Sequence, residues 1–131
     1  MLEFSSEKMV GTIIVAREIS EEEVCDIIVN CFEGGSNYWM GLDNRGADYK
    51  KKPKDEPLAT WCTKILIDGG TLKLYDIEDE DAKWTLTLEQ LIKGIQQNAK
   101  ERPDYADPDN WDAGDTDCII QYALFDEVVY G

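Results

Sequence analysis

Two pairs of adjacent glycines set the order of the elements that this chain can form. Gly34-Gly35 and Gly69-Gly70 each follow a segment whose apolar residues recur at helical spacing. An alternating apolar and polar stretch begins directly after each pair, at residues 36–42 and 71–77. Glycine readily adopts the positive φ that ends many helices. Each pair therefore predicts a joint between a helix and a strand.

Two of the predicted helices begin at capping boxes, in which two side chains three residues apart cap each other's backbone amides. Ser20 and Glu23 open the helix before the first glycine pair, and Thr87 and Gln90 open another helix further along the chain. Pro57 is well placed as the first residue of the helix between them. The sequence predicts about four helices in all.

The last predicted helix follows a linker rich in aspartate and proline. Asp115 or Thr116 is suited to the N-cap of this helix, because both side chains can accept a hydrogen bond from a free backbone amide. Periodicity leaves open whether residues 128–130 continue the helix or form a short final strand.

The strand pattern predicts a small, mainly antiparallel sheet. Residues 9–19, MVGTIIVAREI, alternate around a continuous apolar centre, which predicts a first strand well inside the sheet. Residues 71–77 and 83–87 also alternate, and the polar EDED stretch between them predicts the turn of a β-hairpin. The resulting order, β-α-β-α-β-β-α-α, indicates a single α+β domain over residues 1–131.

The charge balance favours basic partners. The chain has 28 acidic residues and 13 Lys and Arg, for a net charge of −15. Five of the bases fall within residues 45–54, RGADYKKKPK, so the remaining surface is still more negative. Such a surface repels nucleic acid and anionic lipid and attracts basic proteins or divalent cations. We expect no direct nucleic-acid binding and interpret the lysine-rich stretch as a solvated loop.

Several chemistries are disfavoured by residue types that are missing or wrongly spaced. Histidine is absent, and the four cysteines, at 25, 31, 62 and 118, form no CxxC pair, so they are interpreted as reduced, buried side chains. No apolar run is long enough to cross a bilayer, and the N-terminus lacks the apolar core of a signal peptide. We expect a cytoplasmic protein that is not an enzyme and has no cofactor or metal.

The acidic linker is the first candidate binding surface. Its six carboxylates are Asp104, Asp107, Asp109, Asp112, Asp115 and Asp117. They could bind Ca²⁺, but counting from Asp107 the fifth and sixth positions of an EF-hand loop are taken by Trp111 and an aspartate. We interpret the linker as a solvated acidic surface that binds a basic partner, with calcium as the alternative.

A second acidic patch lies at the predicted hairpin turn. It consists of Glu78, Asp79, Glu80 and Asp81. Asp81-Ala82-Lys83 also matches the D-x-K half of a magnesium nuclease motif, for which Asp68 or Asp76 could supply the upstream carboxylate. The match is short and arises readily by chance. A magnesium-dependent nuclease is therefore the least favoured function.

Three aromatic residues could stack on a small ligand. Tyr38, Trp39 and Trp111 offer flat apolar faces, and a protein that sequesters a nucleotide signal is the alternative function. Aromatic residues in alternating strands are more often core residues. The glycine pairs follow helices, whereas a phosphate cradle requires glycines before a helix.

Four stretches carry a resemblance to known proteins. EGGSNYW (33–39), GGTLKLYD (69–76), WTLTLEQLIKGI (84–95) and IIQYALFDEVVYG (119–131) look like parts of a group of small acidic proteins from phages, prophages and other bacterial mobile elements. The resemblance implies that the protein is carried by a mobile element, and it identifies no catalytic residue.

Small acidic proteins of this setting often inhibit host defence. The resemblance therefore suggests an anti-restriction or anti-CRISPR factor that occupies a basic nucleic-acid-binding groove of a host or phage protein. An accessory protein without inhibitory activity is a further alternative. The apolar C-terminus, FDEVVYG, could complete a neighbouring subunit's sheet, so a homodimer also stays open.

Overall fold

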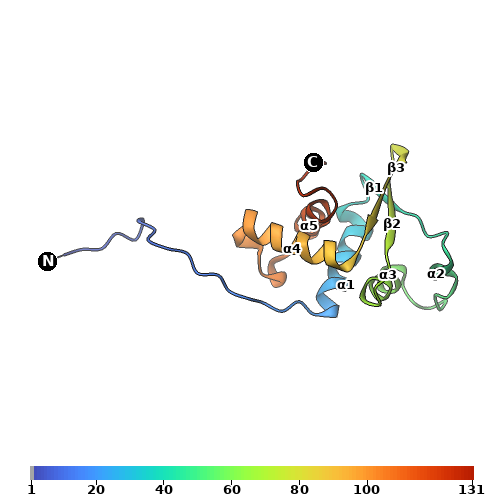
Figure 1. Cartoon of the computed structure of the whole chain (residues 1–131), viewed down its shortest axis with the longest axis horizontal. Coiled ribbons are helices and arrows are strands. Elements are labelled where there is room, and N and C mark those ends of the chain that lie inside the picture. Colours follow the sequence, from blue (N-terminus) through green and yellow to red (C-terminus); the bar gives the residue numbers. More distant parts are fainter. Residues whose placement is uncertain (1) are drawn as a thin grey trace.

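The computed structural model describes residues 2–131, in which an extended N-terminal arm leads into a small α+β domain (Figure 1). The arm comprises residues 2–18. The α-helices are α1 (Glu21–Asn30), α2 (Ala47–Lys50), α3 (Leu58–Ile67), α4 (Leu88–Glu101) and α5 (Ala113–Phe125), and the strands are β1 (Met40–Leu42), β2 (Leu72–Asp76) and β3 (Asp79–Leu86). Short helical turns span η1 (Cys31–Gly35), η2 (Pro103–Tyr105) and η3 (Pro108–Asn110). The predicted α+β class is confirmed.

The three strands form one antiparallel sheet in the order β1-β2-β3. Leu72, Leu74 and Leu86 point into the core and are buried, whereas Lys73 and Thr85 on the opposite face are exposed. The predicted hairpin is confirmed, but its turn is tighter than expected. Asp76 pairs with Asp79, so the turn consists of residues 77–78, and most of the EDED stretch belongs to β3.

Helices α4 and α5 cross closely at Gly94, which is buried. A Cβ at this position would collide with the carbonyl oxygen of Ile119 and lie 2.9 Å from the Cβ of Ala123. A glycine inside a helix lowers its intrinsic helix propensity. The structure shows that the missing side chain permits the helices to approach each other.

The predicted capping boxes of α1 and α4 are both present. The predicted cap of α5, Asp115 or Thr116, is wrong by about one helical turn. Asp112 is the N-cap: its Oδ1 accepts a 2.9 Å hydrogen bond from the Asp115 amide, and the Asp115 carboxylate accepts one of 3.0 Å from the Asp112 amide. A third capping box therefore begins α5.

The two glycine pairs end their helices in different ways. Gly69 has a φ of 90°, and the Gly70 amide donates a 2.8 Å hydrogen bond to the carbonyl of Ile65, which completes the expected C-terminal cap of α3. Gly34 has no such positive φ, because its φ of 165° is extended. At Gly35 a Cβ would lie 2.6 Å from the carbonyl oxygen of Ala113, so this glycine is required by the close approach of α5.

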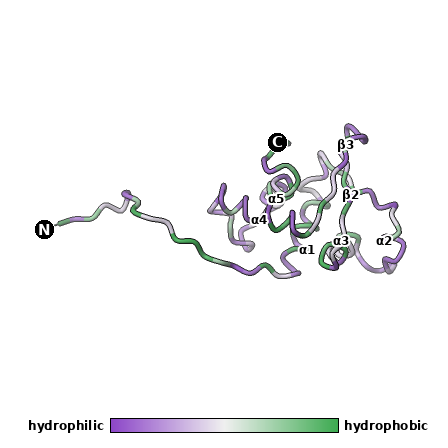
Figure 2. Tube along the Cα trace, viewed as in Figure 1, coloured by the Kyte–Doolittle hydropathy of each residue, from purple (hydrophilic) through white to green (hydrophobic). Residues whose placement is uncertain are grey.

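The predicted strand at residues 9–19 is wrong. This segment has no regular secondary structure, and Val10, Ile13 and Ile14 are almost fully exposed. Figure 2 shows green, hydrophobic stretches along the arm, outside the domain. Alternation indicates that a segment fits a pleated, half-buried surface, but a strand also needs a paired edge. Among residues 2–19, only Ile19, which directly follows the arm, packs against the core.

Candidate functional site

A buried carboxylate, Asp117 on α5, organises the segment that follows the first glycine pair. Its Oδ1 accepts hydrogen bonds from the Ser36 hydroxyl (2.7 Å) and the Trp39 indole Nε1 (2.8 Å). Its Oδ2 accepts hydrogen bonds from the Tyr38 hydroxyl (2.8 Å) and from Nε2 of Gln121 (3.1 Å). Four donors compensate for the desolvation of this charge. The EGGSNYW segment is therefore bonded to α5 through one side chain.

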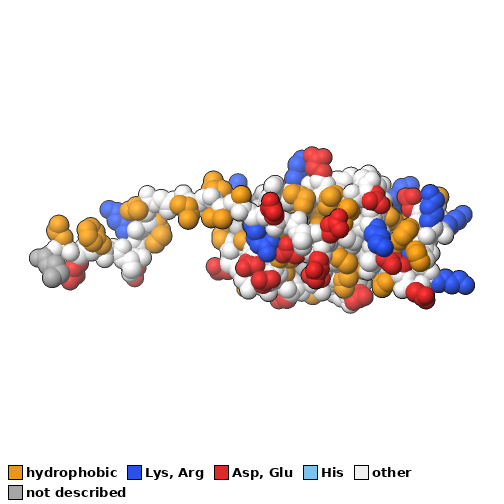
Figure 3. All heavy atoms as spheres, turned by 90° about the horizontal axis from the view of Figure 1, so that it is seen from below, with side chains coloured by type: hydrophobic (Ala, Val, Ile, Leu, Met, Phe, Trp, Pro, Cys, Tyr) orange, Lys and Arg blue, Asp and Glu red, His pale blue; other side chains and the backbone are white. Residues whose placement is uncertain are grey.

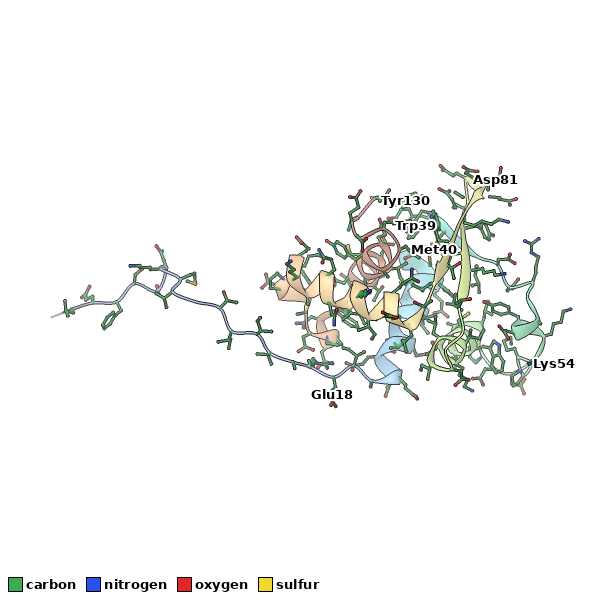
Figure 4. All side chains as sticks on the ribbon, viewed as in Figure 1. Glu18, Trp39, Met40, Lys54, Asp81 and Tyr130 are labelled. Atoms are coloured by element: carbon green, nitrogen blue, oxygen red, sulfur yellow. The ribbon has the colours of Figure 1, made fainter. Side chains whose placement is uncertain are left out.

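The C-terminal tail completes the same cluster. Gln121 accepts hydrogen bonds at its Oε1 from the amides of Val129 (2.8 Å) and Tyr130 (2.7 Å), and its Nε2 donates to the Tyr130 carbonyl (3.0 Å). The Tyr130 ring stacks on Trp39 at a centroid distance of 4.5 Å, and Figure 4 shows the two side by side. Residues 128–130 are therefore neither helix nor strand, and the tail folds back onto its own domain. A homodimer stays a prediction.

The three predicted stacking residues have different environments. Trp39 is 2% exposed and packed against Tyr130, so its ring faces are not open to a ligand. Tyr38 is 49% exposed, but burial of its hydroxyl and the hydrogen bond to Asp117 raise its pKa to about 12. Trp111 is half-buried, and its Nε1 donates a 2.8 Å hydrogen bond to the Tyr105 carbonyl. The structure does not bring these residues together around one cavity.

The acidic linker is smaller as a surface than the sequence predicts. Asp115 is 2% exposed and forms a 2.9 Å ion pair with Arg102, and Asp117 is 7% exposed. Both carboxylates belong to the interior, which corrects their assignment to the patch. The exposed members are Asp104, Asp107, Asp109 and Asp112. These four define the linker patch.

The linker patch lies near the base of the N-terminal arm. The Arg17 guanidinium forms a 2.9 Å ion pair with Glu23, which is the main cause of its raised pKa, and the nearby charges of Asp107 and Asp109 contribute as well. The Asp115 amide lowers the pKa of Asp112 through its hydrogen bond. Figure 3 shows acidic side chains spread over the face seen from below, with many of the basic ones at the end opposite the arm.

The hairpin patch, formed by Glu78, Asp79, Glu80 and Asp81, is exposed as predicted. Figure 4 places Asp81 at the tip of the sheet. Asp76, which pairs with Asp79 of this patch, accepts a 2.7 Å hydrogen bond from the Tyr130 hydroxyl. This hydrogen bond lowers the pKa of Asp76. Across residues 2–131, no three His, Cys, Asp or Glu side chains gather closely enough to hold a metal ion. This holds for the D-x-K segment and for the acidic linker alike.

All four cysteines are free thiols. Cys31 and Cys62 are buried, and desolvation raises the pKa of Cys31 to about 12 and that of Cys62 to about 11. These values keep both thiols protonated at neutral pH, which supports their interpretation as core residues. Cys25 and Cys118 are only partly buried, which corrects the prediction for these two.

Comparisons with known proteins give no family for this chain. No protein-family model, curated protein or solved structure matches it. None of the helices in the described part of the chain is long and apolar enough to span a membrane. The resemblance to proteins of mobile elements therefore stays a prediction.

Proposed function

We propose that this chain is a non-enzymatic acidic binding protein whose linker patch occupies a basic, nucleic-acid-binding groove of a partner protein. An anti-restriction or anti-CRISPR inhibitor carried by a mobile element would act in this way. The observation that carries the proposal is the exposure of Asp104, Asp107, Asp109 and Asp112 on one short segment of a chain with a net charge of −15. None of the four takes part in an ion pair among the described residues.

The backbone that carries these carboxylates is held in place by specific contacts. The Tyr105 carbonyl accepts hydrogen bonds from the Trp111 indole (2.8 Å) and from Nδ2 of Asn98 (3.3 Å). Arg102 lies over the Tyr105 ring at 4.6 Å and is also paired with Asp115. A segment that is already ordered loses less conformational entropy on binding. These contacts favour a surface that presents its charges in a fixed arrangement.

The proposal predicts an association that depends strongly on salt. Attraction between exposed charges is screened over about 8 Å at physiological ionic strength. It mainly increases the association rate and selects the partner. We therefore expect the partner to bind at low salt and to dissociate progressively as salt rises, with little contribution from apolar contacts.

The test is affinity capture of bacterial host proteins on the immobilised full chain, followed by binding measurements with the purified captured protein. The variant Asp104→Asn, Asp107→Asn, Asp109→Asn, Asp112→Asn removes four charges while asparagine preserves the caps at 107 and 112. We expect its Kd to be at least about tenfold higher than that of the wild type.

The matched control removes the same charge from exposed sites elsewhere on the domain. Its substitutions are Glu33→Gln, Asp48→Asn, Asp55→Asn and Asp68→Asn. We expect its Kd to stay within about threefold of the wild-type value. Docking through the linker patch would be contradicted if both variants lost the same affinity for the partner. A Kd that does not change with salt would also contradict it.

A further inference from the structure

The outer face of the sheet carries a groove that lies apart from the linker patch and borders the hairpin patch at Glu80. Its volume is about 600 Å³, which lies within the roughly 300–1,000 Å³ of typical small-ligand clefts. Its lining includes Asp43, Arg45, Lys73, Tyr75, Lys83 and Thr85. The strands supply the floor, and the start of the loop after β1 supplies one wall.

The aromatic ring of Tyr75 forms part of the floor. Tyr75 pairs directly with Gly41 of the neighbouring strand, and its ring lies across this glycine. A Cβ at Gly41 would lie 2.5 Å from Cζ of Tyr75 and 2.6 Å from its hydroxyl oxygen. The absence of a side chain at Gly41 thus allows the ring to lie along the sheet. A half-buried ring in this position can stack on a planar ligand.

Two lysines stand beside this ring without an ion-pair partner. Lys83 is directly opposite Tyr75 in the strand register, and Lys73 lies two residues before Tyr75 on the same face. Both are exposed, and neither belongs to any ion pair found in residues 2–131. Thr85, opposite Lys73, adds a hydroxyl group. The floor therefore offers two cations and a hydroxyl within reach of the same aromatic ring.

The two charged side chains of the groove wall, Arg45 and Asp43, neutralise each other. Arg45 binds Asp43 through two hydrogen bonds of 2.9 and 3.0 Å, and this contact lowers the pKa of Asp43 to about 2, with a contribution from Lys83. Glu80 is the other acidic residue of the lining. The groove as a whole carries a positive charge, which is unusual on a protein with a net charge of −15.

We propose that this groove binds a small aromatic phosphate of the mononucleotide class. The base stacks on Tyr75, and the phosphate lies between Lys73 and Lys83. Carboxylates elsewhere on the domain weaken this binding only modestly, because physiological salt screens charges beyond about 8 Å. A nucleic-acid strand would bring many phosphates against the acidic surface, including Asp79 and Asp81 at the start of β3. A single nucleotide avoids this repulsion, and the inference does not depend on the function of the linker patch.

The test is a titration of the ¹⁵N-labelled full chain with ADP, followed by NMR at physiological ionic strength, with adenosine and inorganic phosphate as separate probes. We expect ADP to shift the amide signals of Lys73, Tyr75 and Lys83 and to bind more tightly than either fragment. The double variant Lys73→Gln, Lys83→Gln should raise the ADP Kd about tenfold or more. The control Lys50→Gln, Lys54→Gln removes the same charge from the lysine-rich loop and should change Kd less than about twofold.

Gly41→Ala tests the aromatic floor separately. Its methyl group would displace the flexible end of the Tyr75 ring, so the fold should persist while the ADP Kd rises. The absence of ADP-induced shifts at these residues would overturn the proposal. So would phosphate binding as tight as ADP binding, equal Kd changes in the two lysine variants, or tighter binding of a single-stranded oligonucleotide than of ADP.

Discussion

The indole Nε1 of Trp39 donates a 2.8 Å hydrogen bond to the buried carboxylate of Asp117, which lies on the last helix of the domain. Ser36, Tyr38 and Gln121 donate to the same carboxylate. One side chain therefore connects the segment after η1 to α5, and α5 in turn holds the C-terminal tail. This relationship gives the EGGSNYW segment a structural role.

Asp117→Asn should destabilise the domain by about 2–3 kcal/mol, because an amide replaces one of two acceptor oxygens and leaves buried donors without an acceptor. Urea denaturation measures the effect as a lower midpoint with an unchanged slope. The control is Asp104→Asn in the exposed linker patch, which we expect to change stability by less than about 0.5 kcal/mol. Equal effects of the two substitutions would show that the Asp117 hydrogen bonds do not stabilise the fold.

Stability should also fall at high pH through Tyr38 and Tyr130. Burial, followed by hydrogen bonds to Asp117 and Asp76, raises the pKa of each to about 12. The pKa of tyrosine in an unfolded chain is about 10. The folded state therefore holds these protons more tightly, and the resulting stabilisation is complete below about pH 10 and lost as the pH rises towards 12.

Melting temperatures across this pH window test the prediction. Tyr38→Phe, Tyr130→Phe should lower the melting temperature at pH 8 and then show a smaller further decrease between pH 10 and 12 than the wild type. Part of the decrease in melting temperature should remain in this variant, because the pKa values of Tyr49 and Tyr122 are also raised. An identical decrease in melting temperature between pH 10 and 12 in variant and wild type would show that Tyr38 and Tyr130 do not cause the loss of stability.

Removal of residues 2–16 should leave the stability of the domain unchanged within about 0.5 kcal/mol. Val10 and Ile14 of this arm are 92% and 97% exposed, whereas Arg17 and Ile19 at its base are retained in the shortened chain. Urea denaturation of the two chains makes the comparison. A loss above about 1 kcal/mol would indicate that the arm packs on the domain as the strand that its pattern predicts.

Gly94→Ala should destabilise the domain by about 1–3 kcal/mol through overpacking between α4 and α5. Intrinsic helix propensity predicts the opposite, a gain of about 1 kcal/mol. The two effects differ in sign, so the melting temperature decides between them. Gln96→Ala, at an exposed position of the same helix, should stay within about 0.5 kcal/mol of the wild type.

The sequence predicts best the features that depend on neighbouring residues. The boxes at Ser20 and Thr87 and the cap at Gly69 are local hydrogen-bonding patterns, and the structure confirms all three. The strand at residues 9–19 is wrong because periodicity carries no information about whether a sheet edge is available. Pairing is a tertiary property, and in the described residues the sheet consists of three strands and does not include the arm.

In the acidic linker, too, the local sequence does not predict which residues are exposed. Asp115 and Asp117 follow four similar aspartates, and nothing in their spacing distinguishes them from the exposed ones. Their burial depends on Arg102 and on donors from residues 36–39, which the fold brings from far along the chain. The groove is predictable only in part: alternation places Lys73 and Tyr75 on one strand face, but their proximity to Arg45 requires the fold.

The most direct test of the proposed function is a competition between this chain and DNA for the captured partner. Fluorescence anisotropy of a labelled DNA duplex bound to the partner is measured while the chain is added. We predict that the wild-type chain displaces the duplex and that the variant with asparagine at 104, 107, 109 and 112 requires about tenfold more protein for the same displacement. A partner that binds the chain and the duplex simultaneously, with undiminished affinity for each, would contradict occupation of a nucleic-acid-binding groove.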